Sequence, residues 1–197
     1  MARRKTEGRS DLSLTSALEQ FAKYGFAKTT IQDIAKAAGV ASGTIYLYYK
    51  SKEEILRACA VRFHLAHKEF SKSILASDQT PLLKLREYLL NRHALWEQET
   101  VGSSSGTDLA QAMVGIAPDI SEAEKTLWLE TLRAILKEGE TKGMYRFESL
   151  SKELKVFLHA MIGFFPLPGT AHPFAPTRRD LLNAIDWFDK KWRIDAN

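Results

Sequence analysis

The sequence predicts an all-α protein of about nine helices, with a small N-terminal head on a larger helical body. Apolar residues recur at every third or fourth position along most of the 197 residues. Two-residue hairpin turns and sustained alternation of apolar and polar residues, which would indicate β-strands, are not found in the sequence. A composition of 45% hydrophobic and 26% charged residues is typical of a globular chain. We expect the head to comprise residues 1–50 and the body residues 51–197.

Seven apolar stripes with helical spacing follow one another along the chain, and each predicts a helix. The stripes run over residues 14–21, 34–38, 55–70, 82–96, 128–139, 154–165 and 181–192. Glycine, proline and serine separate the helices because they favour turns. The expected breaks are Gly25, Gly39, residues 102–106, Pro118, Gly143 and residues 166–176. We expect the first three helices to be short and the later ones to be long.

Short motifs mark the starts of several helices. Four pairs have the spacing of a capping box, in which a hydroxyl accepts from the third amide of the helix and a carboxylate reaches back to the cap. The pairs are Ser51 with Glu54, Ser121 with Glu124, Thr30 with Asp33, and Thr177 with Asp180. Thr80 precedes Pro81, which suits the first position of a helix. These motifs predict where five helices begin.

The excess positive charge is confined to the first quarter of the chain. Residues 1–52 contain nine Lys/Arg and four Asp/Glu, a net charge of +5, whereas residues 53–197 contain 19 and 20. Such a distribution is typical of contact with a polyanion, either nucleic acid or an acidic membrane surface. A solubilising basic tail would have the same charge, so the charge alone does not choose among these.

The cysteine content and the hydropathy indicate the compartment. Cys59 is the one cysteine in the sequence, which excludes an intrachain disulfide and a multi-cysteine metal site. The basic N-terminus is not followed by the apolar segment of a secretory signal. The longest near-apolar run, residues 160–169, is too short to span a bilayer. We therefore expect a cytoplasmic protein that does not enter a membrane.

Residues 30–49 have the layout of a helix-turn-helix. A short helix from Thr30 to about Ala38 runs into Gly39, and a second short helix follows from about Ser42 to Tyr49. Two helices joined by a tight glycine-containing turn can place the second helix in the major groove of DNA. An αα-hairpin with an alanine-rich contact would share this pattern, so DNA binding is one of two interpretations at this point.

Residues 10–60 resemble the DNA-binding domain of the TetR family of bacterial transcriptional regulators. The shared marks are Phe21, Gly25-Phe26, Thr29-Thr30, Asp33-Ile34-Ala35, Ala38-Gly39-Val40, Gly43-Thr44-Ile45-Tyr46 and Tyr49, followed by Ser51-Lys52-Glu53. Many residues at fixed offsets are far more specific than a general helix-turn-helix pattern. The resemblance implies a regulator, expected to be a repressor, that binds a palindromic double-stranded DNA operator as a homodimer and is released by a small-molecule effector.

The resemblance also implies which residues contact DNA. They are Thr30, Gln32, Ser42, Gly43, Thr44, Tyr46, Tyr48 and Lys52. Thr44 would present a hydroxyl and a methyl group to base edges, and Lys52 would neutralise a backbone phosphate. Ala41 departs from the family, which usually has serine before the second helix. Either the cap moves to Ser42 or it is lost, and a lost cap costs about 1 kcal/mol.

The body would hold the dimer interface and the effector pocket of the family. The expected interface residues lie on the last two stripes: Phe157, Met161, Phe165, Leu181, Ile185, Phe188 and Trp192. An intramolecular core is the alternative for these residues. The expected effector contacts are His93, Trp96, Met113, Trp128 and Met161. Their aromatic and apolar character favours an apolar or aromatic effector, although plain core packing would explain them too.

Two other classes of protein are alternatives to a regulator: a catalytic helical bundle and a helical adaptor. A di-iron helical bundle needs Glu-x-x-His pairs, and the sequence has none. Phosphate-binding glycine loops and the common hydrolase motifs are also absent from the sequence. We therefore expect no enzyme activity, no metal and no cofactor. A helical ligand-binding or adaptor protein without sequence-specific DNA binding remains as the alternative function.

Overall fold

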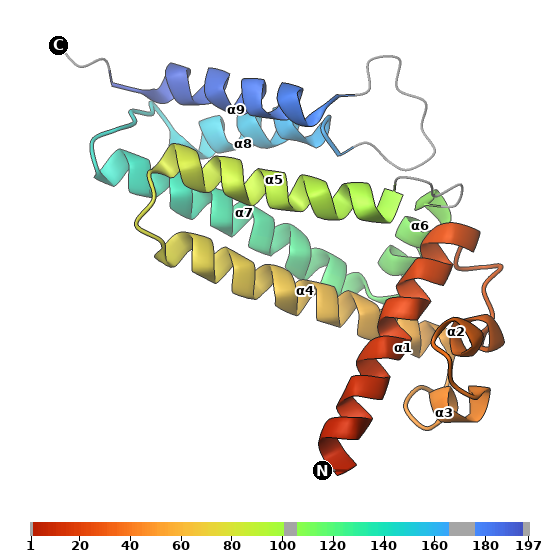
Figure 1. Cartoon of the computed structure of the whole chain (residues 1–197). Helices are drawn as coiled ribbons and strands as arrows, with labels where there is room; N and C mark the ends of the chain where they lie inside the picture. Colours follow the sequence, from red (N-terminus) through yellow and green to blue (C-terminus); the bar gives the residue numbers. More distant parts are fainter. Residues whose placement is uncertain (1, 101–105, 166–175, 195–197) are drawn as a thin grey trace. The chain divides into compact units, whose positions relative to one another are not determined.

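The computed structural model describes residues 2–100, 106–165 and 176–194 (Figure 1). Within these residues the chain forms nine α-helices, so the predicted all-α fold is confirmed. The helices are α1 (Ala2–Tyr24), α2 (Ile31–Ala37), α3 (Ser42–Tyr46), α4 (Lys52–Ala76), α5 (Pro81–Thr100), α6 (Gly106–Ile116), α7 (Pro118–Thr141), α8 (Leu150–Ile162) and α9 (Arg178–Trp192). Among the described residues, no helix is long and apolar enough to cross a membrane.

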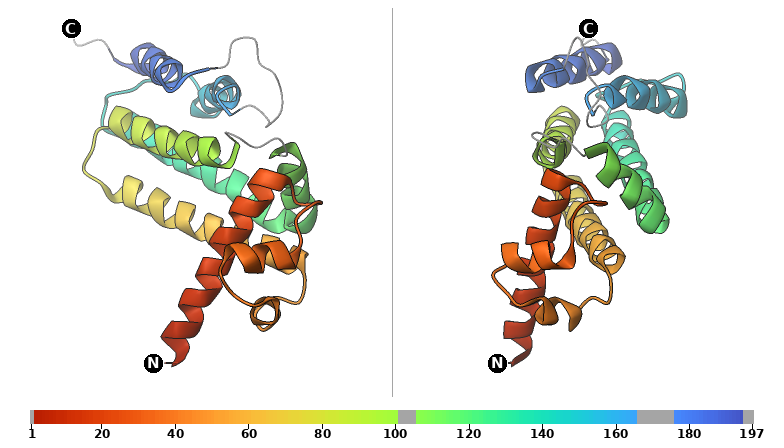
Figure 2. Two further views of the ribbon diagram at one scale, coloured as in Figure 1. Left: turned by 45° about the vertical axis from the view of Figure 1, so that its right-hand side comes forward. Right: turned by 90° about the vertical axis from the view of Figure 1, so that its right-hand side faces the viewer.

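The chain divides into two compact units. Figure 2 draws the ribbon of Figure 1 from two further directions. The first unit is formed by the described parts of residues 1–66 and 99–123. The second unit is formed by the described parts of residues 67–98, 124–166 and 170–197. Each unit has its own hydrophobic core.

The first unit packs α1, α2 and α3 around one apolar centre. Helices α2 and α3 are short as expected, with 7 and 5 residues, but the expectation is wrong for α1, which has 23. Leu14, Phe21, Ile34 and Ile45 bring α1, α2 and α3 together, and the first turns of α4 complete the core. Burying each of these side chains contributes roughly 1.5–3 kcal/mol. Gly39 ends α2 with φ +66°, a backbone conformation that costs other residues about 1 kcal/mol or more. The sharp reversal that separates α2 from α3 therefore depends on this glycine.

Cys59 is part of the same core. Its side chain is fully buried, and its Sγ lies 3.5 Å from the carbonyl oxygen of Leu14, to which it can donate. Burial raises the pKa of the Cys59 thiol to about 12. A thiol with this pKa stays protonated near neutral pH and is a poor nucleophile. The structure gives Cys59 a packing role.

The second unit is a bundle of the second half of α4, α5, most of α7, α8 and α9. Lys84, which is nearly fully buried, donates from Nζ to Glu138 Oε2 at 2.8 Å and so joins α5 to α7. The hydroxyls of Ser71 and Thr131 hydrogen-bond and join α4 to α7. Polar pairs of this kind satisfy buried groups that would otherwise destabilise the fold. Figure 1 shows α4, α5 and α7 running side by side.

The segment after α7 is held against α9 by Tyr145. Its hydroxyl donates to Asp189 Oδ1 at 2.6 Å, and its ring packs edge-on against Trp192. Burial, followed by the Asp189 carboxylate, raises the pKa of Tyr145 well above its ordinary value. The ring lies directly over Gly139 of α7, where a side chain would collide with it. This close approach, rather than an unusual backbone angle, requires a glycine at position 139.

Both capping boxes that contain an aspartate form as predicted. Thr30 and Thr177 each accept a hydrogen bond from the amide three residues on, and the carboxylates of Asp33 and Asp180 accept from the cap amides. These bonds lower the pKa of both carboxyl groups, with the threonine side chain as the largest cause.

The predicted box at Ser121 and Glu124 is wrong. Helix α7 begins at Pro118, so Ser121 lies inside the helix and its hydroxyl donates to Ala117 O at 3.1 Å. Glu124 instead lies 2.8 Å from His67 Nδ1 on α4. The spacing matched a motif, but a proline three residues earlier provides a better helix start.

Candidate nucleic-acid interface

Helices α2 and α3 form the expected helix-turn-helix within the first unit. Ile34, Ala35 and Ile45 face the core and fix the two helices against each other. The Val40 amide donates to Ala35 O at 2.9 Å and closes the turn. Buried apolar contacts on one side leave the opposite side of α3 free to meet a ligand.

Helix α3 is shorter than the sequence suggested. It ends at Tyr46, and Tyr48 lies in the turn that follows, with its amide donating to Ile45 O at 2.9 Å. The N-cap is Ala41, which makes no side-chain cap hydrogen bond, so of the two alternatives the cap is lost rather than moved to Ser42. The recognition element is therefore one helical turn followed by a turn, not two full turns.

The predicted contact residues of α3 are all near the surface. Gly43 is exposed, Ser42, Thr44 and Tyr48 are half-buried, and Tyr46 is 52% exposed. Leu47, which the sequence reading did not select, is 80% exposed. Leu47 lies two residues after the core residue Ile45 and so off its helical face, which was the sequence signal for its exposure.

Thr30 and Gln32 lie at the start of α2, and both are exposed. The Thr30 hydroxyl is already engaged, because it donates to Asp33 Oδ2 at 2.6 Å and accepts from the Asp33 amide at 3.2 Å. The hydroxyl therefore both donates and accepts within its own helix start, as a capping residue does.

Lys52 has partners within the head. Its Nζ donates to Phe26 O at 2.7 Å and to Ala27 O at 3.3 Å, and it lies 4.5 Å from the centre of the Phe26 ring. On the other side of the loop, the Ala27 amide donates to Asp108 Oδ2 of α6 at 3.0 Å. Lys52 thus holds the loop between α1 and α2, a role that the sequence did not predict.

We expect the substitution Lys52→Ala to destabilise the protein by about 1–2 kcal/mol, because it removes hydrogen bonds from a charged donor. Urea unfolding monitored by circular dichroism measures the change, with Lys50→Ala as the matched control because Lys50 is exposed. Unchanged stability combined with weaker DNA binding would instead assign Lys52 to phosphate contact alone.

A family model described as bacterial regulatory proteins of the tetR family matches residues 14–59. The transcriptional repressor KstR2 of Mycolicibacterium smegmatis is 30% identical over 148 residues, which cover 70% of this chain and 68% of that repressor. The chain belongs to the TetR family of transcriptional regulators. TetR-family regulators are non-enzymatic.

The chain spans well under half the length of several other relatives that it matches. The regulator TtgR of Pseudomonas putida is 35% identical over 78 residues, which cover 39% of this chain and only 37% of TtgR. A crystal structure of a transcriptional regulator from Cytophaga hutchinsonii has a TM-score of 0.70 at 19% identity and covers 95% of this chain and 100% of that one. At this identity the likeness shows the fold alone. TetR-family members bind DNA and small ligands, typically as dimers.

The effector residues expected for a TetR-family body lie in different places. His93 and Trp128 both contact the Phe165 ring, with centroids 5.9 and 5.5 Å apart, and the Arg92 guanidinium lies 4.9 Å from the Trp128 ring centre. Met161 is fully buried in the core of the second unit. Met113 is half-buried and packs against the core of the first unit. The side chain of Trp96 lies outside the described residues.

The expected dimer residues serve the core of a single chain. Six of them are at most 6% exposed and pack against each other within the second unit: Phe157, Met161, Leu181, Ile185, Phe188 and Trp192. Phe165 is half-buried. A side chain covered by its own chain is not available to a second copy. The large apolar side chains that α8 and α9 expose are others: Val156, Ile162 and Trp187, which are 52%, 60% and 61% exposed.

Proposed function

We propose that the chain is a homodimeric repressor that binds a palindromic operator through α2 and α3 and is released by a small-molecule effector. The observation that carries this proposal is the helix-turn-helix, with Ile34 and Ile45 in the core and the polar face of α3 exposed. Two such heads on a twofold axis read two half-sites, which supplies the affinity and specificity that one short helix lacks.

In this proposal three positions of α3 meet the DNA, each in a different way. Gly43 permits close approach of the backbone to DNA, Thr44 presents its hydroxyl and methyl group, and Tyr46 donates to a phosphate. Tyr48, in the following turn, reaches a flanking base. Because α3 is only one turn long, most of the affinity of the head for DNA comes from phosphate contacts around α3.

We propose that residues 1–50 form the DNA-binding domain and residues 51–197 the dimerisation and effector domain. The dimer is formed by the outward faces of α8 and α9, centred on Val156 and Trp187, since a large exposed tryptophan favours an interface. The effector is an apolar or aromatic molecule that contacts Trp128 and His93. A 100-fold loss of operator affinity on binding requires roughly 2.7 kcal/mol of coupling.

The substitution Tyr48→Ala tests the base-reading role. We expect affinity for a selected operator to fall about tenfold or more, because a base contact contributes about 1–3 kcal/mol of discrimination. Affinity for random-sequence duplex of the same length should change little. Fluorescence anisotropy on both duplexes at one salt concentration measures the two values. Equal losses of affinity on both duplexes would contradict base reading by Tyr48. The control Leu12→Ala should bind both duplexes with the affinity of the wild type, which shows that the assay reports local effects.

A further inference from the structure

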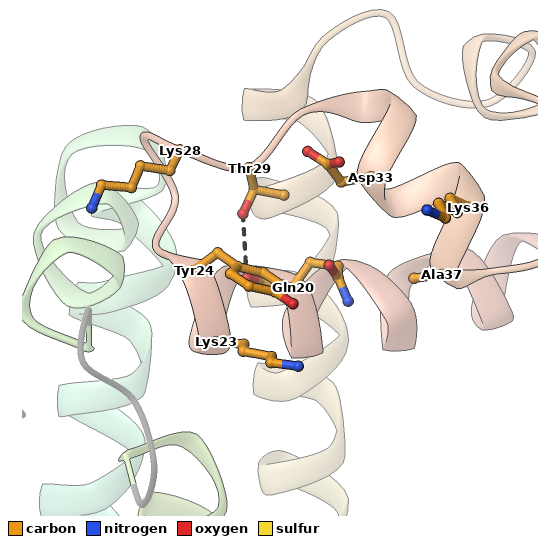
Figure 3. A pocket seen from close by; sticks show the side chains of 8 residues that line it. All are labelled: Gln20, Lys23, Tyr24, Lys28, Thr29, Asp33, Lys36 and Ala37. Carbon is orange, nitrogen blue, oxygen red and sulfur yellow. Dashed lines mark hydrogen bonds between the residues drawn. The ribbon is translucent and has the colours of Figure 1, made fainter.

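An open pocket of about 640 Å³ lies on the head between the end of α1, the following loop and α2. Its lining residues, drawn in Figure 3, are Gln20, Lys23, Tyr24, Lys28, Thr29, Asp33, Lys36 and Ala37. They all belong to the first unit, and none of them is required by the reading mode of α3 described above. We call this feature the lysine pocket.

The lysine pocket is positively charged. Lys23, Lys28 and Lys36 each contribute an exposed ammonium group, against the single carboxylate of Asp33. That carboxylate is engaged by the amide and hydroxyl of Thr30, at 2.9 and 2.6 Å. The capping bonds hold it at the start of α2, where it interacts electrostatically with Lys36, so one carboxylate stands against three ammonium groups. The pocket therefore attracts anions.

The lysines surround the pocket instead of converging on one point. Lys28 comes from the loop, Lys36 from α2 and Lys23 from α1, and Figure 3 shows their ammonium groups at separate places around the pocket. A single compact ion would need donors that converge on it. A chain of separated negative charges matches cations spread around a rim, and a DNA strand provides such a chain.

The position along α2 connects the lysine pocket to the DNA-reading surface. Gln32 and Lys36 are four residues apart and so lie on the same face of α2. Lys28 precedes the first helical residue, Ile31, by three positions. A strand that contacts Gln32 thus has Lys36 one helical turn away and Lys28 just before the helix.

We propose that the lysine pocket binds backbone phosphates of operator DNA outside the bases that α3 reads. This inference rests on the proposed function and extends it, because it makes the footprint of each head longer than its half-site. Contacts of this kind are independent of sequence and depend on salt. They supply affinity that the short, uncapped α3 does not.

The test uses the full-length triple variant Lys23→Gln, Lys28→Gln, Lys36→Gln. Its matched control, Lys68→Gln, Lys155→Gln, Lys190→Gln, removes the same charge from exposed positions of the second unit. Both are compared with the wild type on a duplex that just spans the selected operator and on one with about 10 extra base pairs at each end. Affinities are measured across a salt series, and sodium pyrophosphate is titrated in parallel by calorimetry.

We expect the wild type and the control to bind the long duplex more tightly than the short one. The triple variant should lose this difference, with a loss on the order of tenfold on the long duplex and a salt slope lower by up to about 3 per head. If the triple variant matches the control on both duplexes, the pocket inference is overturned, while binding of the short duplex still upholds the proposed function. A third outcome is that only the triple variant loses pyrophosphate binding, while the DNA affinity of no protein depends on duplex length. This outcome would assign the pocket to a free phosphate-bearing solute and contradict the inference. Failure of the wild type to bind either duplex would overturn both.

Discussion

An aspartate in place of Gly43 is expected to reduce operator affinity more than about 100-fold without unfolding the protein. Gly43 is exposed at the start of α3, and a Cβ added there meets no atom within 4 Å. Its φ is not among the positive values of the described glycines, so a side chain causes no backbone strain. A carboxylate facing phosphates costs several kcal/mol, and each 1.4 kcal/mol is tenfold in affinity.

Two matched variants separate this charge effect from simple damage. Gly43→Lys should keep affinity for random-sequence DNA, because it adds the opposite charge at the same atom. Gly115→Asp places the same charge on an exposed position of α6 with equally open surroundings and should bind like the wild type. Anisotropy titrations and thermal melting curves give the two readouts. Retained operator binding by Gly43→Asp would mean that α3 does not face DNA.

The substitution Gly139→Ala is expected to destabilise the second unit by about 3 kcal/mol or more. The new Cβ would lie 2.2 Å from Tyr145 Cδ2, far inside van der Waals contact. Tyr145 cannot move away easily, because its ring is buried against Trp192 and its hydroxyl is bonded to Asp189. Overpacking of a filled core typically costs 1–3 kcal/mol, and this contact involves the base of a fixed ring.

Thermal unfolding measures the effect of Gly139→Ala, with an expected fall in the melting temperature of roughly 6–12 °C. The control Gly115→Ala lies in open space within a helix and should be neutral or slightly stabilising. The double variant Gly139→Ala, Tyr145→Ala tests the cause, since removing the ring should make the added methyl group nearly harmless relative to Tyr145→Ala alone. Equal melting temperatures for Gly139→Ala and the wild type would contradict the assigned packing.

Local signals predicted the fold well because they act over a few residues. Gly25, Gly39 and Gly143 all have positive φ, as breaks between helices require. Thr30 and Thr177 cap helices because a hydroxyl followed three residues later by a carboxylate satisfies free amides without any tertiary partner. The wrong capping box at Ser121 shows the limit of local signals. Both Pro118 and Ser121 could begin the helix, and the sequence pattern did not rank them.

The functional surface was less predictable because it depends on contacts across the chain. The hydrogen bonds of Lys52 reach back 26 residues to Phe26, and no local pattern indicates them. The lysine pocket unites Lys23, Lys28 and Lys36, of which the sequence showed only the net positive charge. The apolar stripes of α8 and α9 were found correctly, but periodicity does not distinguish a face buried within one chain from a face that meets a second chain.

Selection of bound DNA from a random duplex pool, by the purified protein at about 0.15 M salt, tests the central claim most directly. We expect enrichment of a palindrome with two half-sites, about one helical turn or a multiple of it apart. The Gly43→Asp variant should enrich nothing under the same conditions. Recognition of an operator by α2 and α3 would be contradicted if the folded wild-type dimer enriched no sequence. It would also be contradicted if the Gly43→Asp variant enriched the same palindrome as the wild type.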